Sequence, residues 1–216
     1  MSDATADTES LPLFLRIADE LRRDGYSIIA NALPIPLADA LCRQIQDRAG
    51  LAFCPAGIGR GNQFSHNNRV RRDNIAWMDG SHEAEKNWLA WMASLQLTLN
   101  RELLLGLFSY ESHFAHYPPG AFYRKHVDAF RGQTNRVLST VTYLNRDWQA
   151  NDGGELLIYS HNGQQLATVL PEFATLVVFL SEDFPHEVLP ARHDRFSVAG
   201  WFRVNTSIPG RVDPPS

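Results

Sequence analysis

The sequence of 216 residues carries 20 lysines and arginines against 24 aspartates and glutamates, a formal net charge of −4. This balance gives no general attraction to nucleic acid or to an anionic membrane, and no stretch approaches the roughly 18 apolar residues of a transmembrane helix. A content of 44% hydrophobic residues indicates a globular chain rather than disorder. Two isolated cysteines indicate a reducing compartment, so we expect a cytoplasmic protein. From the charge we expect no nucleic-acid or membrane partner, and we expect a monomer.

The N-terminal part predicts helices that serve as packing elements. Residues 1–10 are acidic and polar and predict a disordered tail, whereas residues 11–216 predict a single domain. Apolar residues at helical spacing, with glycines placed to end the helices, predict a helix from Leu11, a strand over 26–30, a helix over 34–50 and a helix over 82–105. The aromatic stripe of the last helix favours packing against a sheet over binding a cofactor.

Residues 57–74 form a long irregular stretch between the second and third helices. It is rich in glycine and asparagine and contains Arg60, Arg69, Arg71 and Arg72. Its length exceeds that of a plain connector, which favours a lid or a binding loop. The alternative is a solvated hairpin without a function.

From Ser112 the chain changes to short apolar segments separated by turn residues such as Pro-Gly, Asn-Asp-Gly-Gly and Asn-Gly. This pattern predicts eight strands over 112–118, 121–128, 136–145, 154–160, 164–170, 174–180, 185–190 and 195–204. Eight short strands favour a jelly roll over a parallel α/β sheet. The predicted fold class is therefore mainly β, a jelly roll over about 112–204 with N-terminal helices packed on one sheet.

A candidate metal site combines three side chains from the predicted strands. In an extended segment, His126 and Asp128 leave the same face and can converge on one point. His186 follows much later and can come from another strand of the same sheet system. Two histidines and one carboxylate leave three metal positions open, which is typical of non-haem Fe(II) oxygenases. His113 and His116 are three residues apart on a predicted strand, so they point to opposite faces and are not expected to share a metal.

A candidate anion site follows the third metal ligand. Arg195 and Ser197 share one strand face, and a short turn followed by an antiparallel strand would return Arg195 to the metal, where its planar fork suits a dicarboxylate co-substrate. Tyr143 alternates with Ser139 and Val141, so all three could line the pocket, with the phenol donating to the same carboxylate. The alternative is that Tyr143 is an ordinary core tyrosine.

Several motifs together resemble one known family. They are Tyr117-Pro, Tyr123-Arg-Lys-His-Val-Asp128, Tyr143-Leu-Asn-Arg-Asp-Trp148, Gly153-Gly154, Pro185-His186-Glu-Val188, Arg195 and Trp201. The chain resembles the 2-oxoglutarate-dependent prolyl 4-hydroxylases, and within them the oxygen-sensing hydroxylases that act on hypoxia-inducible factor. The resemblance extends weakly to residues 71–77, where the family has its mobile substrate loop. It implies a double-stranded β-helix and a single-domain bacterial member without the regulatory extension of the animal proteins.

The resemblance also implies a function. It implies hydroxylation of a prolyl residue in a protein, with a translation elongation factor as a candidate substrate, and Fe(II), 2-oxoglutarate, O2 and ascorbate as cofactors or co-substrates. It places Arg195, Tyr143, Ser197 and Tyr117 at the co-substrate, and Tyr123, Arg136, Trp201, Asp73 and Arg71 at the polypeptide. Two alternatives remain: an oxygenase that acts on free proline, another small molecule or a nucleobase, and a non-catalytic metal-binding jelly roll. The second would be expected to lose a metal ligand or Arg195, and neither is lost.

Overall fold

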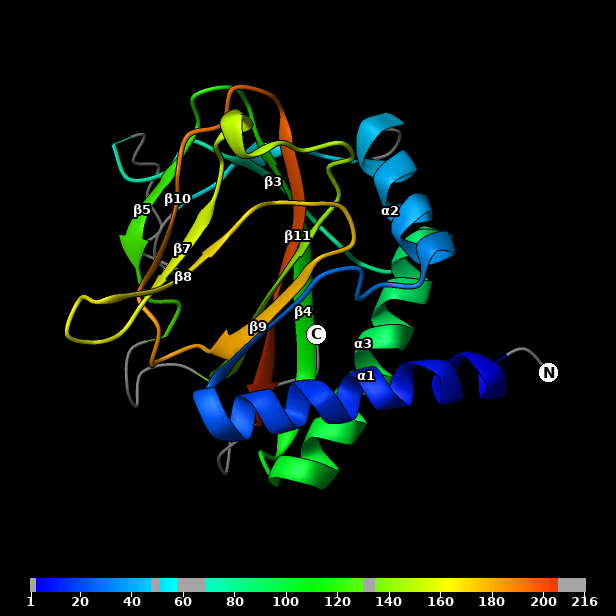
Figure 1. Ribbon diagram of the computed structural model, residues 1–216. Coiled ribbons are helices and arrows are strands. Elements are labelled where there is room, and N and C mark those ends of the chain that lie inside the picture. The colour runs from blue at the N-terminus through cyan, green and yellow to red at the C-terminus, as the bar shows by residue number, and fades with distance from the viewer. Residues whose placement is uncertain (1–2, 48–50, 58–68, 130–134, 206–216) are drawn as a thin grey trace, which may run out of the picture.

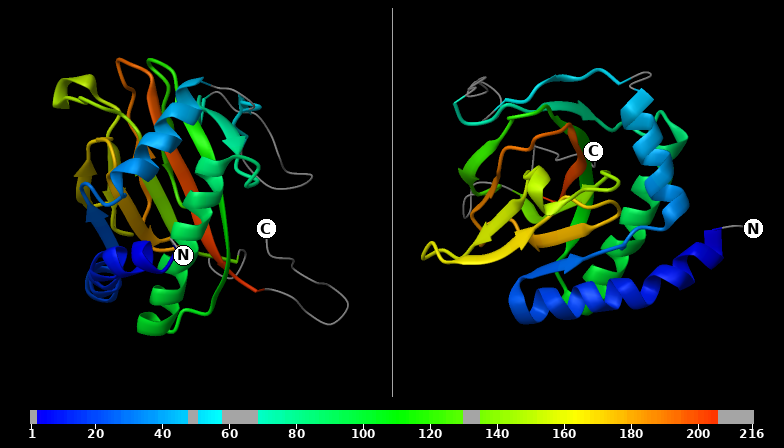
Figure 2. Two further views of the ribbon diagram at one scale, coloured as in Figure 1. Left: turned by 90° about the vertical axis from the view of Figure 1, so that its right-hand side faces the viewer. Right: turned by 45° about the horizontal axis from the view of Figure 1, so that its top comes forward.

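Two antiparallel β-sheets face each other, and three helices cover the outer side of the larger sheet (Figure 1, Figure 2). The structure is a computed structural model that describes residues 3–47, 51–57, 69–129 and 135–205. The helices are α1 (Asp3–Asp24), α2 (Ile35–Asp47), α3 (Glu83–Leu103) and a short 3-10 helix over Ala150–Asp152. Among the described residues, none of these helices has the length and apolar character needed to cross a bilayer.

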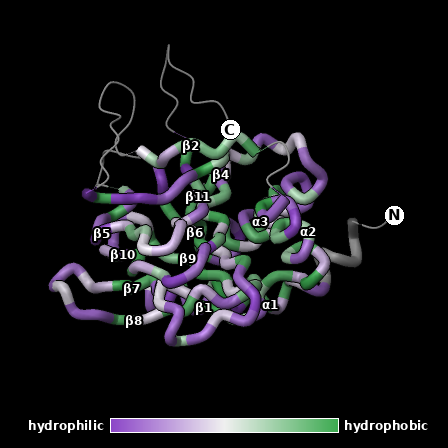
Figure 3. Tube along the Cα trace, turned by 90° about the horizontal axis from the view of Figure 1, so that it is seen from above, coloured by the Kyte–Doolittle hydropathy of each residue, from purple (hydrophilic) through white to green (hydrophobic). Residues whose placement is uncertain are grey.

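Within the part of the chain that the structure describes, the larger sheet has seven strands and the smaller has four. In spatial order the larger sheet contains β1 (Tyr26–Ile29), β9 (Leu176–Leu180), β6 (Arg136–Tyr143), β11 (Arg195–Val204), β4 (Leu107–Tyr117), β3 (Asn74–Trp77) and β2 (Cys54–Pro55). The smaller sheet contains β5 (Tyr123–His126), β10 (His186–Val188), β7 (Leu156–Tyr159) and β8 (Gln165–Val169). The turn between β7 and β8 projects from one side and is hydrophilic (Figure 3).

Each face of the larger sheet has its own apolar core. The outer face packs against the helices, with Trp88 and Leu95 of α3 and Phe114 of β4 fully buried. The inner face packs against the smaller sheet through a separate cluster that includes Ile158 and Phe179. Strand residues therefore alternate between two buried environments, and one end of the space between the sheets is left for polar residues.

The predicted fold class is confirmed. All eight strands predicted from Ser112 onward are present, with shifted ends, and the helices pack on one sheet as expected. The short strands β2 and β3 were missed, because residues 71–77 were interpreted as a substrate loop. In the structure, β3 pairs with β4, so that Ile75 lies opposite Ala115. The predicted lid over 57–74 lies largely outside the described residues, which include only Gly57 and 69–74 of it.

The first helix begins earlier than the predicted start at Leu11, so residues 3–10 of the predicted tail over 1–10 are helical, whereas residues 1–2 lie outside the described residues. Helix α1 begins at Asp3 and contains Pro12 in its interior. Ser10 is buried and its hydroxyl accepts a hydrogen bond of 3.1 Å from Trp91 Nε1 of α3. This contact to α3 is tertiary, so helical periodicity alone did not reveal it.

The predicted return of the chain to the metal site is also wrong in its topology. Strands β10 and β11 do not form an antiparallel pair: β10 belongs to the smaller sheet and β11 to the larger one. The two strands therefore contribute His186 and Arg195 to the cavity from different sheets. By contrast, the prediction that His186 comes from the same sheet system as His126 is confirmed, because the two residues are register partners on β10 and β5.

Candidate active site

A cavity of about 1300 Å³ opens between the two sheets. The smaller sheet contributes Tyr123, His126 and His186 to its wall, and the larger sheet contributes Tyr117, Arg195 and Trp201. These residues come from four strands, β4, β5, β10 and β11, and the sheet pairing brings them together. Asp128 also lines the cavity. It lies just beyond the end of β5, which closes at His126 rather than at residue 128 as predicted.

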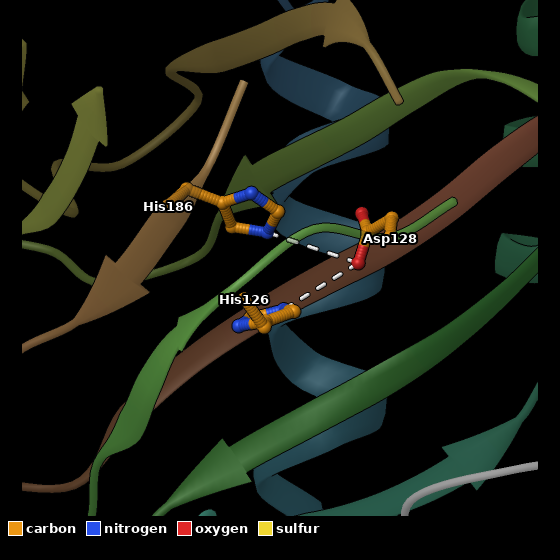
Figure 4. A group of neighbouring side chains, drawn as sticks. All are labelled: His126, Asp128 and His186. Carbon is orange, nitrogen blue, oxygen red and sulfur yellow. Dashed lines mark ion pairs between the residues drawn. The ribbon is translucent and has the colours of Figure 1, made fainter. Parts of the chain in front are cut away.

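The three predicted metal ligands converge at one end of this cavity (Figure 4). His126 Nε2 lies 3.4 Å and His186 Nε2 lies 3.8 Å from Asp128 Oδ1. One ligand atom from each residue lies within 4.8 Å of the other two. Two imidazole nitrogens and one carboxylate oxygen on one side of a cavity form a donor set that fits Fe(II) with coordination positions open.

The backbone holds both histidines in the form that a metal requires. His126 Nδ1 lies 2.8 Å from the carbonyl of Arg124, and His186 Nδ1 lies 2.9 Å from the carbonyl of Phe184. Because a carbonyl accepts, each Nδ1 carries the proton and each Nε2 keeps its lone pair. Burial lowers the pKa of His186 to about 4, with the nearby His126 acting in the same direction, so this ring is neutral at ordinary pH.

The two oxygens of the Asp128 carboxylate have different partners. Its Oδ2 accepts hydrogen bonds from Ser139 Oγ at 2.7 Å and from Trp201 Nε1 at 3.0 Å. Ser139 and Trp201 are register partners on β6 and β11. Burial alone would raise the pKa of Asp128, but His186, which is protonated at acid pH below its own pKa, the contact with His126 and the bond from Ser139 outweigh burial and lower the pKa. Asp128 is therefore ionised, with Oδ1 facing the two histidines.

Arg195 lies at another part of the cavity and has unused hydrogen-bonding capacity. Its side chain is fully buried, and its Nε donates to the carbonyl of Gly154 at 2.8 Å. Its Nη2 and the hydroxyl of Tyr143 are both buried without a hydrogen-bond partner among the described residues. Tyr143 does not line the cavity wall as predicted but is buried beside Arg195, with its ring 5.0 Å from the guanidinium carbon. Burial raises the pKa of Tyr143 to about 12.

A buried guanidinium without a counter-ion is costly, and among the described residues Arg195 forms no ion pair with a carboxylate. A carboxylate bound here would satisfy Nη2 and accept from the Tyr143 hydroxyl. These orphaned donors fit the far carboxylate of 2-oxoglutarate. Ser197 lies two residues along β11 and also lines the cavity, whereas Tyr117 lies opposite Arg195 on β4 with its ring 4.9 Å from the guanidinium carbon.

Gly154 allows the chain to approach Arg195 closely. Its φ is +74°, a left-handed conformation that favours glycine. A Cβ at this position would lie 2.9 Å from Ala191 Cβ and 3.1 Å from Arg195 Cδ. From the sequence, the Gly153-Gly154 motif was interpreted as a turn between strands and as part of the family resemblance. The structure gives a physical reason for the second glycine, which supplies the carbonyl that holds Arg195.

The residues predicted at the polypeptide form two separate groups. In the first, Arg71 forms two bonds to Asp73, at 2.7 and 2.5 Å, and its guanidinium lies 4.3 Å from the centre of the Tyr123 ring. The ring of Tyr123 in turn stacks on the metal-site residue His126, with centroids 3.5 Å apart. Asp73 is buried and is not part of the cavity wall. The polypeptide-binding roles of these residues remain predictions.

In the second group, Arg136 donates to Glu111 at 2.8 and 3.0 Å and lies 3.6 Å above the ring of Trp201. Sequence reasoning did not single out Glu111. It also missed His113, a buried cavity residue in edge contact with Trp77, whose pKa burial lowers to about 4. The expected separation of His113 from His116 is confirmed, because His116 contacts Asp194 instead. Strand alternation from Tyr117 back to Glu111 was the signal that could have found both.

Comparisons with known proteins identify the family of this chain. Residues 112–203 match the model of the 2OG-Fe(II) oxygenase superfamily. A solved prolyl-4-hydroxylase from Pseudomonas putida is 42% identical, with a TM-score of 0.80 over 88% of this chain and 98% of that one. The chain therefore belongs to the 2OG-Fe(II) oxygenase superfamily, whose cofactors are Fe(II) and 2-oxoglutarate.

Within the superfamily, the similarity is to prolyl hydroxylases. Human Egl nine homolog 1 is 33% identical over 142 residues, which cover 62% of this chain. The match spans only 33% of the length of that human protein. A prolyl hydroxylase of Trichoplax adhaerens, solved with a peptide of the hypoxia-inducible factor oxygen degradation domain, is 25% identical with a TM-score of 0.78 over 91% of both chains.

Proposed function

We propose that this protein is an Fe(II)- and 2-oxoglutarate-dependent dioxygenase that hydroxylates a prolyl residue of a protein at the 4-position. The observation that carries the proposal is one cavity lined both by the three-ligand metal site and by Arg195, whose buried Nη2 has no partner among the described residues and which lies beside the equally unpartnered hydroxyl of Tyr143. The similarity to prolyl hydroxylases supports the choice of proline as the target.

Each residue has a defined task in this proposal. His126, Asp128 and His186 would hold Fe(II) through Nε2, Oδ1 and Nε2. Arg195 and Tyr143 would hold the far carboxylate of 2-oxoglutarate, with Ser197 and Tyr117 beside it. Bound Fe(II) supplies the oxidising chemistry that places one atom of O2 in the product and the other in succinate, with release of CO2. The protein itself binds, orients and excludes water.

The size of the cavity supports a polypeptide substrate. Its volume of about 1300 Å³ exceeds the usual 300–1,000 Å³ of small-molecule pockets. Its wall also carries aromatic side chains, including Trp77, which is 53% exposed. An exposed aromatic at the wall suits contact with a chain that crosses the opening. A translation elongation factor is the candidate partner to test first.

The test couples two measurements on the purified protein with Fe(II), 2-oxoglutarate and O2. Succinate formation reports turnover, and mass spectrometry of the candidate protein reports a gain of one oxygen on proline. We expect both signals to rise together with a protein or a proline-containing peptide. The same peptide with its target proline replaced by alanine serves as the matched control and should give only slow, uncoupled succinate release.

The second candidate function, an oxygenase of free proline or another small molecule, predicts a different result. Succinate would then form stoichiometrically with the free amino acid, and no protein from the same cell would gain oxygen. That outcome would reject the polypeptide substrate while keeping the cofactors. Failure to bind 2-oxoglutarate in the presence of Fe(II) would reject the dioxygenase itself.

A further inference from the structure

Trp201 connects the metal site to a cluster of charged residues. On one side, its Nε1 donates to Asp128 Oδ2 at 3.0 Å. On the other, the guanidinium carbon of Arg136 lies 3.6 Å from the centre of its ring. The contact runs between neighbouring strands, since Arg136 on β6 pairs in register with Arg203 on β11, two residues from Trp201. A continuous path of contacts therefore leads from Arg136 to a predicted metal ligand.

Glu111 on β4 fixes the cationic end of this path. Its Oε1 accepts two hydrogen bonds from Arg136, at 3.0 and 2.8 Å, and its Oε2 lies 3.2 Å from Arg203 Nη1. The side chains of Arg136 and Glu111 are only 17% and 16% exposed. A guanidinium held by two hydrogen bonds keeps a defined orientation. Arg136 is thus held over the indole, whether or not a substrate is present.

A cation above an aromatic ring is attracted to its electron density and polarises the ring. In a buried network, polarisation of a donor strengthens the hydrogen bond that it makes. The indole N–H and the Ser139 hydroxyl both act on Oδ2 of Asp128 and leave Oδ1 toward the histidines. Such outer partners of a ligand typically change metal affinity 10–100-fold.

We propose that Arg136 is a positioning residue of the metal site: fixed by Glu111, it orients and polarises Trp201 so that the indole N–H holds Asp128 with one oxygen toward the metal. The inference rests on the proposed function only in taking His126, Asp128 and His186 as the metal ligands. It differs from the polypeptide-binding role predicted from the sequence, because it acts in the absence of any substrate.

Two other roles for Arg136 predict different results. A residue that only contacts the polypeptide would change the KM for the peptide and leave metal affinity unaltered. A residue that acts only through its charge would repel the metal ion, so its loss would tighten metal binding. Positioning through Trp201 predicts weaker metal binding when Arg136 is lost.

The experiment measures Co(II) affinity by competition with a chelator, on the full chain without 2-oxoglutarate or peptide. We expect about 10–100-fold weaker binding for Trp201→Phe, which keeps an aromatic ring but removes the N–H. For Arg136→Gln we expect about 3–10-fold weaker binding, and for Arg136→Lys, which keeps the cation, a value nearer the wild type. The visible spectrum of bound Co(II) should shift in the weakened variants, because it depends on the number and geometry of the ligands.

Two controls make the assignment specific. In the Trp201→Phe background, Arg136→Gln should cause no further loss, because the two residues act through one hydrogen bond. Arg203→Gln removes the other cation paired with Glu111 and should leave Co(II) affinity at or above the wild-type value. Metal-free thermal unfolding of each variant separates a loss of folding from a loss of positioning.

Wild-type or tighter Co(II) binding by Arg136→Gln overturns the proposal, and so does an additive loss in the double variant. Unchanged affinity and an unchanged spectrum in Trp201→Phe overturn it independently, even if Arg136→Gln does not fold. If Asp128→Ala binds Co(II) as tightly as the wild type, the proposed metal site fails instead, and the two failures are distinguishable.

Discussion

The two ends of the cavity differ in how completely their polar atoms are satisfied. At the metal end, the Nδ1 atoms of His126 and His186 and the Oδ2 atom of Asp128 all have protein partners. At the other end, Arg195 Nη2 and the Tyr143 hydroxyl are buried without one among the described residues. The first arrangement needs only a metal ion, whereas the second needs an organic anion to offset the cost of burying a charge.

This difference predicts that the two ends can be damaged separately. The metal end depends on side chains that are already oriented, so it should bind metal without a co-substrate. The end near Arg195 gains its full hydrogen bonding only when an anion is bound. Substitutions there should change affinity for 2-oxoglutarate and leave metal affinity close to that of the wild type.

The largest expected effect is that of Asp128→Ala, which removes a ligand and the negative charge between the two histidines. We expect Co(II) or Fe(II) affinity to fall more than about 100-fold, since even outer partners are worth 10–100-fold, and turnover to be lost. Metal content after dialysis and succinate release measure the two effects. Glu83→Ala, which removes an exposed carboxylate of α3, is the control. Unchanged metal content would remove Asp128 from the ligand set.

Arg195→Lys should weaken only the binding of 2-oxoglutarate near Arg195. Lysine keeps the charge but loses the planar fork, and a lost charge-assisted hydrogen bond of about 1.5–3 kcal/mol predicts a roughly 10–100-fold higher half-saturation concentration for 2-oxoglutarate. Metal affinity should not change. Arg192→Lys, at an exposed arginine of the preceding turn, is the matched control. An unaltered half-saturation concentration would contradict the anion-binding role.

Gly154→Ala should weaken the binding of 2-oxoglutarate by disturbing the packing around Arg195. The new Cβ would contact Ala191 and Arg195 and would require a strained φ of +74°, so we expect a stability loss of about 1–3 kcal/mol and weaker 2-oxoglutarate binding. Denaturant unfolding and co-substrate titration measure both. Gly163→Ala shares the positive φ but meets no atom within 4 Å. If the two variants behave alike, the contact with Arg195 is not important.

Tyr143→Phe has the smallest expected effect and tests whether the buried hydroxyl serves the co-substrate or the core. It removes a buried hydroxyl that has no partner among the described residues, so protein stability should stay the same or rise slightly. Loss of one hydrogen bond of about 1 kcal/mol predicts roughly fivefold weaker 2-oxoglutarate binding. A stability loss without a change in co-substrate affinity would identify Tyr143 as an ordinary core residue.

The sequence predicted the site better where the geometry is local. His126 and Asp128 followed from the alternation of an extended chain, although β5 ends at His126 and a bend brings Asp128 inward. The placement of β10 and β11 in different sheets was not predictable from the short turn between them. The same residues could form a hairpin of the two strands or a connection from one sheet to the other. The hydrogen bond from Trp201 to Asp128 and the approach of Gly154 to Arg195 join residues far apart in sequence. No local pattern encodes such contacts.

Strand β11 also limits how this protein can evolve. It carries Arg195, Ser197 and Trp201 on its cavity face and is paired in register with both β4 and β6. An insertion or deletion of one residue within it would turn every later side chain to the opposite face. The site can therefore diverge along β11 only by substitution. Changes in chain length that alter what the cavity accepts are confined to the loops at the ends of the sheets.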